Sequence, residues 1–321
     1  MSESEPARMQ LDQHDALIIG GGPAGLSAAV YLARSLRSVA IFDSDRPARS
    51  DWVQVNHNYL GFPGGISIIE LGQRGREQAE RFGARFINAE VTALAKSGEL
   101  FEATVDGEVV LGRAVILATG VRDRWVEFPG YEGFIGRSMH WCIVCDGYEM
   151  QGQRVLIVGD DEHAAFVSLQ MRRFTDRITL LVHPDAPLMA EPLQAELVQA
   201  GIRCITGEIA TARAHEPGYF EAVVLVGGEV IELDHLFSEQ GAEPNVALAQ
   251  ALGMALTDEG YIKVDTEART SIPYIYAAGD VTRLFSHQVV TAAHEGATAA
   301  TTLAWDLFEQ DRSSRADRAA R

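Results

Sequence analysis

A glycine-rich turn near the N-terminus constrains the fold of this chain more than any other feature. The turn follows an apolar stretch at 16–19, precedes a helical pattern at 26–36, and is followed by a second apolar stretch, 38–42, that ends at Asp43. Glycines let the backbone turn tightly beside a pyrophosphate, and the N-terminus of the following helix supplies amide donors to it. The acid accepts hydrogen bonds from the ribose hydroxyl groups. We therefore predict a βαβ dinucleotide-binding unit. Its G-x-G-x-x-G motif lies at Gly20, Gly22 and Gly25.

A second unit of the same kind begins near Arg154. An apolar strand pattern at 155–158 leads into a turn at 159–164 and a helix to about residue 173, and a further strand pattern follows at 178–182. Two such modules in one chain predict an α/β protein with two Rossmann-like three-layer dinucleotide-binding domains.

Composition narrows the class of protein. The 321 residues are 47% hydrophobic and 22% charged, which excludes disordered, collagen-like and disulfide-scaffold chains. A net charge of −18 makes nucleic acid and anionic membranes poor partners. No apolar run reaches the ~20 residues that a membrane span requires, so we expect a soluble, cytoplasmic protein.

The cysteines indicate redox chemistry. Cys142 and Cys145 form a CxxC motif, and Cys204 stands alone in a strand pattern that predicts a buried thiol. In a CxxC, one thiolate attacks a disulfide and its neighbour resolves the mixed disulfide. Zinc is the alternative, with His140 as a third ligand, but structural zinc sites take four ligands and no second paired motif occurs. We therefore predict no metal.

Together with these features, three further motifs resemble those of the low-molecular-weight thioredoxin reductases. The motifs are Ala118-Thr119-Gly120, Gly279-Asp280, and Gln288 before the last helix. The resemblance extends from residue 17 to about 308. It implies a discontinuous FAD domain at 1–124 and 258–321, a CxxC domain at 125–257 inserted into it, and a homodimer.

The resemblance also implies roles for individual residues. Cys145 would exchange electrons with the flavin, Cys142 would attack the disulfide substrate, and Asp146 would donate or accept the proton. Asp43 would bind the adenosine ribose and Asp280 the ribityl chain. The other residues implied to bind FAD are Gly20, Gly22, Pro23, Ala24, Gly25, Ala118, Thr119, Gly120, Gly279, His287, Gln288 and Val289. At His287 the family usually has arginine.

The second module departs from the family pattern. Gly159, Asp161 and Ala164 replace G-x-G-x-x-A, Asp160 and Glu162 add two more acids, and no Lys or Arg lies between 177 and 203. Phosphate recognition favours bidentate arginine. We therefore expect no NADPH site, although Asp185 leaves NADH as an alternative.

Without NADPH, the implied electron donor is ferredoxin or a second FAD. Ferredoxin would dock on Arg122 and Arg124, or on the arginines at 172, 173 and 177, while Trp125, Trp141 and Tyr148 would enclose a second flavin ring. The predicted function is electron exchange between FAD, the Cys142–Cys145 pair and a thioredoxin-like or other disulfide substrate. The alternatives are a dithiol oxidase that uses oxygen and a non-catalytic redox sensor. We expect 311–321 to be a mobile tail.

Overall fold

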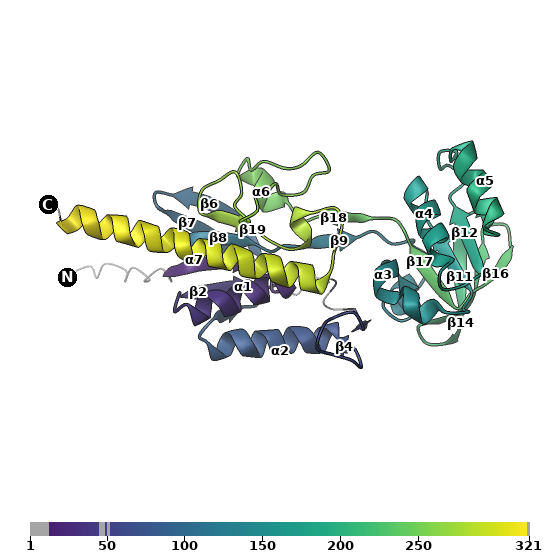
Figure 1. The fold of residues 1–321 in the computed structure, drawn as a ribbon, viewed down its shortest axis with the longest axis horizontal. Helices are drawn as coiled ribbons and strands as arrows, with labels where there is room; N and C mark the ends of the chain where they lie inside the picture. Colours follow the sequence, from purple (N-terminus) through teal and green to yellow (C-terminus); the bar gives the residue numbers. More distant parts are fainter. Residues whose placement is uncertain (1–12, 45–48, 50–51, 320–321) are drawn as a thin grey trace, which may run out of the picture. The chain divides into compact units, whose positions relative to one another are not determined.

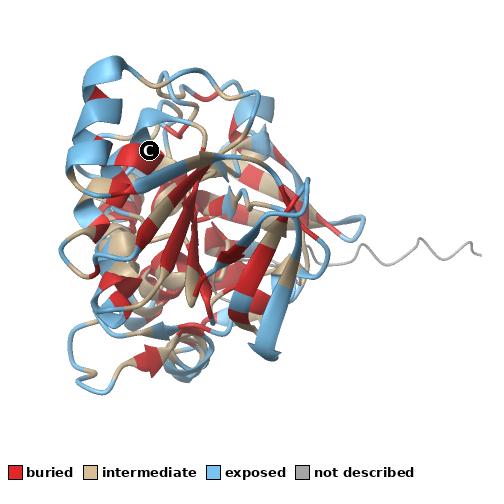
Figure 2. Cartoon of the chain, turned by 90° about the vertical axis from the view of Figure 1, so that its right-hand side faces the viewer, coloured by how far each residue is buried: buried red, intermediate tan, exposed pale blue. Residues whose placement is uncertain are grey.

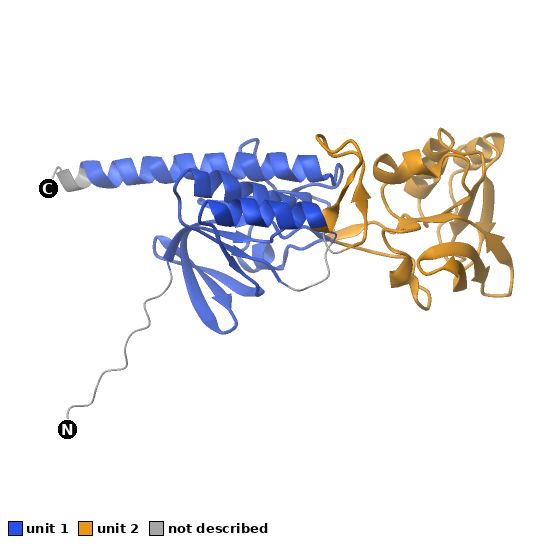
Figure 3. Cartoon of the chain, turned by 90° about the horizontal axis from the view of Figure 1, so that it is seen from below, with its two compact units in different colours: residues 1–50, 70–121, 244–321 blue, residues 51–69, 122–243 orange. Residues whose placement is uncertain are grey.

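The computed structural model describes residues 13–44, 49 and 52–319. The chain forms two compact units (Figure 3). The first contains the described residues within 1–50, 70–121 and 244–321, and the second those within 51–69 and 122–243. These limits differ from the predicted ones. Residues 244–257 belong to the first unit because Ala249 and Met254 are buried in its core, and 51–69 belongs to the second unit.

The first unit is built on a seven-stranded sheet in the order β5-β2-β1-β8-β7-β6, with β19 paired to β8 (Figure 1). β1 lies parallel to both β2 and β8, and β6, β7 and β8 are antiparallel neighbours. The strands are β1 (Gln13–Ile19), β2 (Val39–Phe42), β5 (Arg85–Ile87), β6 (Val91–Ser97), β7 (Leu100–Val105), β8 (Glu108–Leu117) and β19 (Ile275–Ala277).

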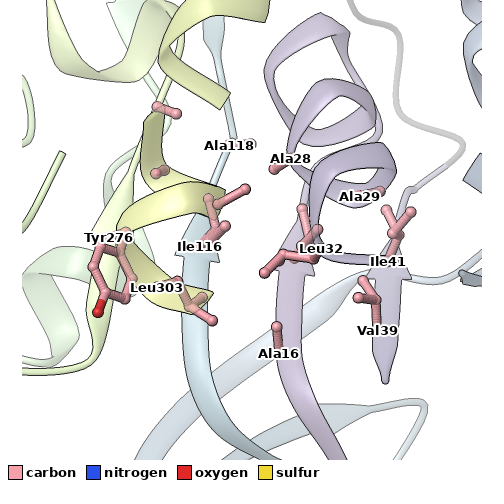
Figure 4. Close-up of a cluster of buried hydrophobic side chains, with 14 of the residues drawn as sticks. Ala16, Ala28, Ala29, Leu32, Val39, Ile41, Ile116, Ala118, Tyr276 and Leu303 are labelled. Carbon is pink, nitrogen blue, oxygen red and sulfur yellow. The ribbon is translucent and has the colours of Figure 1, made fainter. Parts of the chain in front are cut away.

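Two helices pack together beside this sheet. Small residues let α1 (Pro23–Arg34) approach α7 (Val289–Ala319) closely, since a Cβ at Gly296 would overlap the Ala24 carbonyl. Figure 4 shows Leu32 of α1, Ile116 of β8 and Leu303 of α7 in one buried cluster. The remaining helices of this unit are α2 (Ile68–Arg81), whose first two residues belong to the second unit, α6 (Ala247–Ala251) and the 3-10 helix η4 (Asp280–Thr282).

The second unit contains a five-stranded parallel sheet in the order β10-β17-β11-β12-β13. Buried residues follow the strands of this sheet except β13, whereas the helices expose their outer faces (Figure 2). The strands are β10 (Met139–His140), β11 (Val155–Val158), β12 (Ile178–Val182), β13 (Arg203–Thr206) and β17 (His235–Ser238). The helices are α3 (Ile143–Asp146), α4 (Glu162–Met171), α5 (Glu191–Gln199), η2 (Tyr131–Phe134) and η3 (Gly147–Met150).

Three smaller sheets complete the fold. An antiparallel sheet contains β14 (Ile209–Glu216), β15 (Tyr219–Leu225) and β16 (Val230–Glu232). A hairpin joins β3 (Val55–Asn56) and β4 (Ile66–Ser67), and the segments that connect the two units pair as β9 (Val121–Asp123) and β18 (Ala242–Pro244). Among the described residues, no helix has both the length and the apolar character of a membrane span.

Two expectations from the sequence were wrong. Residues 311–319 of the predicted mobile tail instead continue α7, and 320–321 lie outside the described residues. Ion pairs of Asp311 with Arg37 and Arg113, at 3.1 and 2.6 Å, tie the start of this stretch to the first unit. Cys204 is exposed rather than buried, because it lies on β13, an edge strand of its sheet that the rest of the second unit leaves uncovered.

Candidate functional site

A disulfide joins Cys142 and Cys145 at the start of α3, with their Cα atoms 5.2 Å apart. The backbone N–H groups of Cys145 and Asp146 both donate to the Cys142 carbonyl, at 3.0 and 3.1 Å. This single helical turn fixes the spacing of the two sulfurs and places Asp146 directly after Cys145. In the described part of the chain, no three His, Cys, Asp or Glu side chains are grouped to hold a metal ion.

The Asp146 carboxylate is buried beside the disulfide-bearing turn. The side-chain amide of Gln54 donates to both of its oxygens, at 3.3 and 3.4 Å. On its other side, His140 Nδ1 lies 3.6 Å from Asp146 Oδ2. The CxxC acid is therefore positioned by one amide and one imidazole, both of them buried.

His140 also contacts a second histidine. Its Nε2 lies 3.0 Å from Nδ1 of His235, the first residue of β17. Burial and the neighbouring His140 lower the pKa of His235 to about 4, although Asp234 and Asp146 act in the opposite direction. His235 is therefore neutral at physiological pH.

Gln54 reaches Asp146 because the β3–β4 hairpin packs within the second unit. The Gln54 carbonyl accepts from the Ile68 N–H at 3.0 Å, and Trp52 packs edge-on against Trp125 with ring centroids 6.1 Å apart. Gly136 allows a close approach, since a Cβ there would lie 2.9 Å from the Val53 oxygen. The sequence analysis missed both Gln54 and His235, because neither residue belongs to a motif.

In the first unit, the predicted FAD-binding turn is tightly closed by its glycines. Gly20 has a φ of +111°, and a Cβ there would overlap the Ala118 carbonyl, while a Cβ at Gly25 would overlap the Gly20 carbonyl. Asp43 Oδ1 accepts from the Gly21 N–H at 3.0 Å. The structure thus brings the turn, the acid and the end of β8 together.

The N-terminus of α1 remains open. Among the described residues, no side chain caps it, and no heavy atom lies within 4 Å of a Cβ built at Gly22. Pro23, Ala24 and Gly25 carry no charge in the first turn. Pro23 has no backbone N–H, but the N–H groups of Ala24 and Gly25 are suited to bind a phosphate, so this end of the first unit fits a dinucleotide such as FAD.

The later predicted FAD residues lie around the same turn. A Cβ at Gly279 would lie 2.9 Å from the Ala24 Cβ, and Asp280 forms an ion pair with Arg49 at 2.9 Å. His287 Nε2 lies 2.7 Å from the Arg283 carbonyl oxygen. Beside Ala118, the Thr119 hydroxyl and the Gly120 carbonyl are held by Asn245. Gln288 directly precedes the last helix, α7, and Val289 is its first residue.

The corresponding turn of the second unit has the opposite character. Asp161 caps α4, since its carboxylate accepts from the Ala164 N–H at 3.1 Å. Asp160 accepts from the His183 N–H at 3.0 Å, at the end of β12. Glu162 adds another acid to the first turn of α4. A carboxylate of the chain itself, that of Asp161, therefore occupies the Ala164 N–H in the first turn of α4.

The aromatic residues near the disulfide contact one another. Trp125 packs edge-on against Trp141, with ring centroids 5.2 Å apart, and both rings pack against the core of the second unit. Tyr148 is 74% exposed. The two tryptophans thus have a structural role in this core.

Comparison with known proteins identifies relatives along most of the chain. Residues 14–297 match the family described as pyridine nucleotide-disulphide oxidoreductase. The thioredoxin reductase of Treponema pallidum is 34% identical, over 89% of this chain and 95% of its own length, and that of Aquifex aeolicus is 32% identical, over 92% and 93%.

Solved structures agree with these matches. The crystal structure of HlmI superposes with a TM-score of 0.88 at 28% identity and covers 95% of this chain and 96% of its own. The thioredoxin reductase of Streptococcus pyogenes gives a TM-score of 0.86 at 28% identity, over 92% and 99%. The predicted α/β fold with Rossmann-type parallel sheets is confirmed.

Proposed function

Because the chain belongs to the pyridine nucleotide-disulphide oxidoreductase family, we propose that it is a flavin-dependent disulfide oxidoreductase that works without a pyridine nucleotide. The observation that supports independence of a pyridine nucleotide is the contrast between α1 and α4, the helices that follow the two predicted nucleotide-binding turns. The N-terminus of α1 is open and uncharged, whereas that of α4 is capped by Asp161.

The first unit would hold FAD. Its pyrophosphate would accept from the backbone N–H groups of Gly22, Ala24 and Gly25. Asp43 would bind the adenosine ribose, and Asp280 would bind the ribityl chain. The turn Ala118-Thr119-Gly120 and the residues His287, Gln288 and Val289 would complete the site. When bound, FAD supplies a two-electron carrier that exchanges electrons with a disulfide.

The second unit disfavours a nucleotide on electrostatic grounds. Two like charges ~4 Å apart repel by about 1 kcal/mol in water and by about 4 kcal/mol at an effective dielectric of 20. Asp160, Asp161 and Glu162 together would oppose a pyrophosphate by several such pairs. A second FAD faces the same repulsion if its pyrophosphate binds there, so we favour one flavin per chain.

The cysteines perform the exchange with substrate. In the reductive direction, the Cys142 thiolate attacks the substrate disulfide, and Asp146 gives a proton to the departing thiolate. The Cys145 thiolate then attacks the Cys142 sulfur, which restores the disulfide and releases the substrate dithiol. The names of the relatives favour a thioredoxin-like substrate.

The charged residues on the surface give little support for ferredoxin as the electron donor. Ferredoxin requires a basic docking patch, but Arg122 pairs with Glu243 and Arg172 pairs with Asp176. Each candidate cluster is therefore partly neutralised. We rank a dithiol donor above ferredoxin, because a dithiol needs no such patch. With oxygen as acceptor, the same residues would form a dithiol oxidase, in which a dithiol and O2 give a disulfide and H2O2.

The decisive experiment is an anaerobic titration of the purified protein with NADPH and then NADH, followed by flavin absorbance. We expect no bleaching by either nucleotide and full bleaching by dithionite and by dithiothreitol. Rapid bleaching by a nucleotide would overturn the nucleotide independence. In air, H2O2 formed on adding dithiothreitol would identify the oxidase.

We also propose that the protein forms a homodimer and that it is located in the cytoplasm. Trp305 and Phe308 on α7 are 64% and 47% exposed, and their ring centroids lie 5.4 Å apart. An exposed aromatic pair on a helix is typical of an interface. Sedimentation equilibrium would test the dimer, and Trp305→Glu should shift it to monomer. Cell fractionation would test the location.

A further inference from the structure

Three titratable side chains of the second unit form a continuous line that starts beside the disulfide. Asp146 Oδ2 lies 3.6 Å from His140 Nδ1, and His140 Nε2 lies 3.0 Å from His235 Nδ1. Asp146 and His140 are buried, at 8% and 6% exposure, whereas His235 is only half-buried. The line therefore leads from the interior toward the surface.

His140 Nδ1 is the unusual atom in this line. It is buried, and within the described part of the chain it makes no hydrogen bond, although it faces the Asp146 carboxylate. An unsatisfied buried polar atom costs roughly 1–3 kcal/mol. A proton on Asp146 would satisfy this atom after a small approach, because a carboxylic O–H donates to a bare imidazole nitrogen.

We propose that His140 and His235 form a proton relay that connects Asp146 with solvent. The proposal rests on the proposed function, in which Asp146 gives up or takes a proton in each cycle and must be reset. Asp146 is buried, so its proton needs a path. His140 and His235 act through Asp146, as positioning and relay residues.

The relay has two states that differ by one proton. In the first, Asp146 is protonated and donates to His140 Nδ1, while His140 Nε2–H donates to His235 Nδ1 and His235 Nε2 carries a proton. In the second, Asp146 is ionised and accepts from His140 Nδ1–H, while His235 Nδ1–H donates to His140 Nε2. Passage from the first state to the second moves three protons by one bond each. The net result is one proton transferred from Asp146 to solvent, and both histidines are neutral before and after.

The surroundings hold the two histidines in this line. The charged and titratable groups that face His235 are His140, Asp146 and Asp234, and the last is held by Arg154 at 2.7 Å. Because its pKa is lowered, His235 stays neutral. A charged His235 would carry protons on both ring nitrogens and could not accept the proton from His140. The His140 ring packs against Phe237, with centroids 5.2 Å apart, which fixes its plane.

The test uses the FAD-loaded protein with dithiothreitol as the only reductant, under anaerobic conditions and with flavin bleaching as the readout. His140→Phe keeps an aromatic ring against Phe237 but transfers no proton. We expect the bleaching rate to fall roughly 10- to 100-fold, up to the lower end of general acid–base effects, because Asp146 itself is retained. The exposed His215 provides the matched control, and His215→Asn should match the wild type.

Two further readouts separate a relay from a structural role. In His235→Ala, added imidazole should restore the rate, because His235 is half-buried and the ring can enter from solvent. The equilibrium of the Cys142–Cys145 disulfide with dithiothreitol, measured by alkylation without using the flavin, should stay within a few-fold of wild type in both variants. A structural role would shift that equilibrium and would not respond to imidazole.

The outcomes also separate this proposal from the proposed function. If dithiothreitol does not bleach the wild-type flavin, the proposed function fails. If it does, and both histidine variants bleach at the wild-type rate, the relay alone is wrong. Slow variants with no imidazole rescue and a shifted disulfide equilibrium would likewise overturn the relay.

Discussion

The carboxylate of Asp161 accepts a hydrogen bond from the backbone N–H of Ala164, 3.1 Å away, at the first turn of α4. At the corresponding turn of α1, Gly22 holds the capping position and, among the described residues, no side chain supplies a bond. One Rossmann helix thus carries its own anion, and the other is left free to bind a phosphate. Under the proposed function, the same topology would serve stability in one unit and FAD binding in the other.

Replacement of this cap should weaken the second unit. Asp161→Ala removes the acceptor for the Ala164 N–H, and we expect the free energy of unfolding to fall by about 0.5–2 kcal/mol. Urea denaturation, followed by far-UV circular dichroism, measures the change. Asp185→Ala is the matched control, because the Asp185 side chain is 94% exposed and caps no helix. Equal stability of the two variants would show that the cap contributes nothing.

Gly22→Ala should separate FAD binding from folding. Gly22 has a φ of −71°, which alanine adopts freely, and a Cβ there meets no described atom within 4 Å. We therefore expect unchanged stability of the apoprotein but a large loss of bound flavin, because the methyl group would occupy the space of the pyrophosphate. The ratio of flavin to protein absorbance measures this loss.

The control for Gly22→Ala is Gly72→Ala, a glycine of α2 whose Cβ is also free of contacts. This variant should retain its flavin. If Gly22→Ala binds as much FAD as Gly72→Ala, the predicted position of the pyrophosphate is wrong.

Gln54→Ala should slow thiol exchange without disturbing the disulfide. The Gln54 amide holds both oxygens of Asp146, at 3.3 and 3.4 Å, and its loss would leave the carboxylate free to rotate away from the cysteines. We expect the rate of reduction by dithiothreitol to fall roughly 10-fold, less than the ~100-fold or more expected on loss of an acid–base group, because Asp146 itself remains. Gln151→Ala removes an exposed amide that bonds only locally to the Tyr148 carbonyl and should leave the rate unchanged. A wild-type rate in Gln54→Ala would remove Gln54 from the site.

The sequence predicted those parts of the site that lie in local motifs. The glycine turns, the CxxC pair and Asp43 are each readable within a few residues, because backbone geometry demands those residue types at fixed spacing. Gln54 and His235 have no such signature. They reach Asp146 and His140 through the β3–β4 hairpin and the pairing of β10 with β17, which bring distant segments together.

The two errors of the sequence analysis have similar causes. Cys204 lies in an apolar strand pattern, but whether a strand is central or at the edge depends on the order of strands in the sheet. The stretch after residue 310 lacks large apolar side chains, so hydrophobic periodicity gave no helix signal there. Ion pairs to the rest of the first unit hold it instead.

These ion pairs predict a pH-dependent contribution to stability. A hydrogen bond from Arg113, together with Arg37, lowers the pKa of Asp311 below its ordinary value near 3.8. A carboxyl group with a lowered folded pKa stabilises the native state above its unfolded pKa, and this contribution is lost as the pH falls through the folded value. The ion pairs should therefore stabilise the protein fully at pH 7 and progressively less below about pH 4.

Asp311→Asn tests this directly. Because the Asp311 side chain is 35% exposed, we expect a loss of only about 1 kcal/mol at pH 7, the upper range for pairs near the surface. The stability difference from wild type should shrink as the pH falls below about 4, where the carboxyl takes up its proton first in the unfolded and then in the folded state. Urea unfolding at several pH values measures it, with the exposed Asp258→Asn as control. A difference that stayed constant over this range would show that Asp311 acts through packing, because only a charge interaction disappears when the carboxyl is protonated.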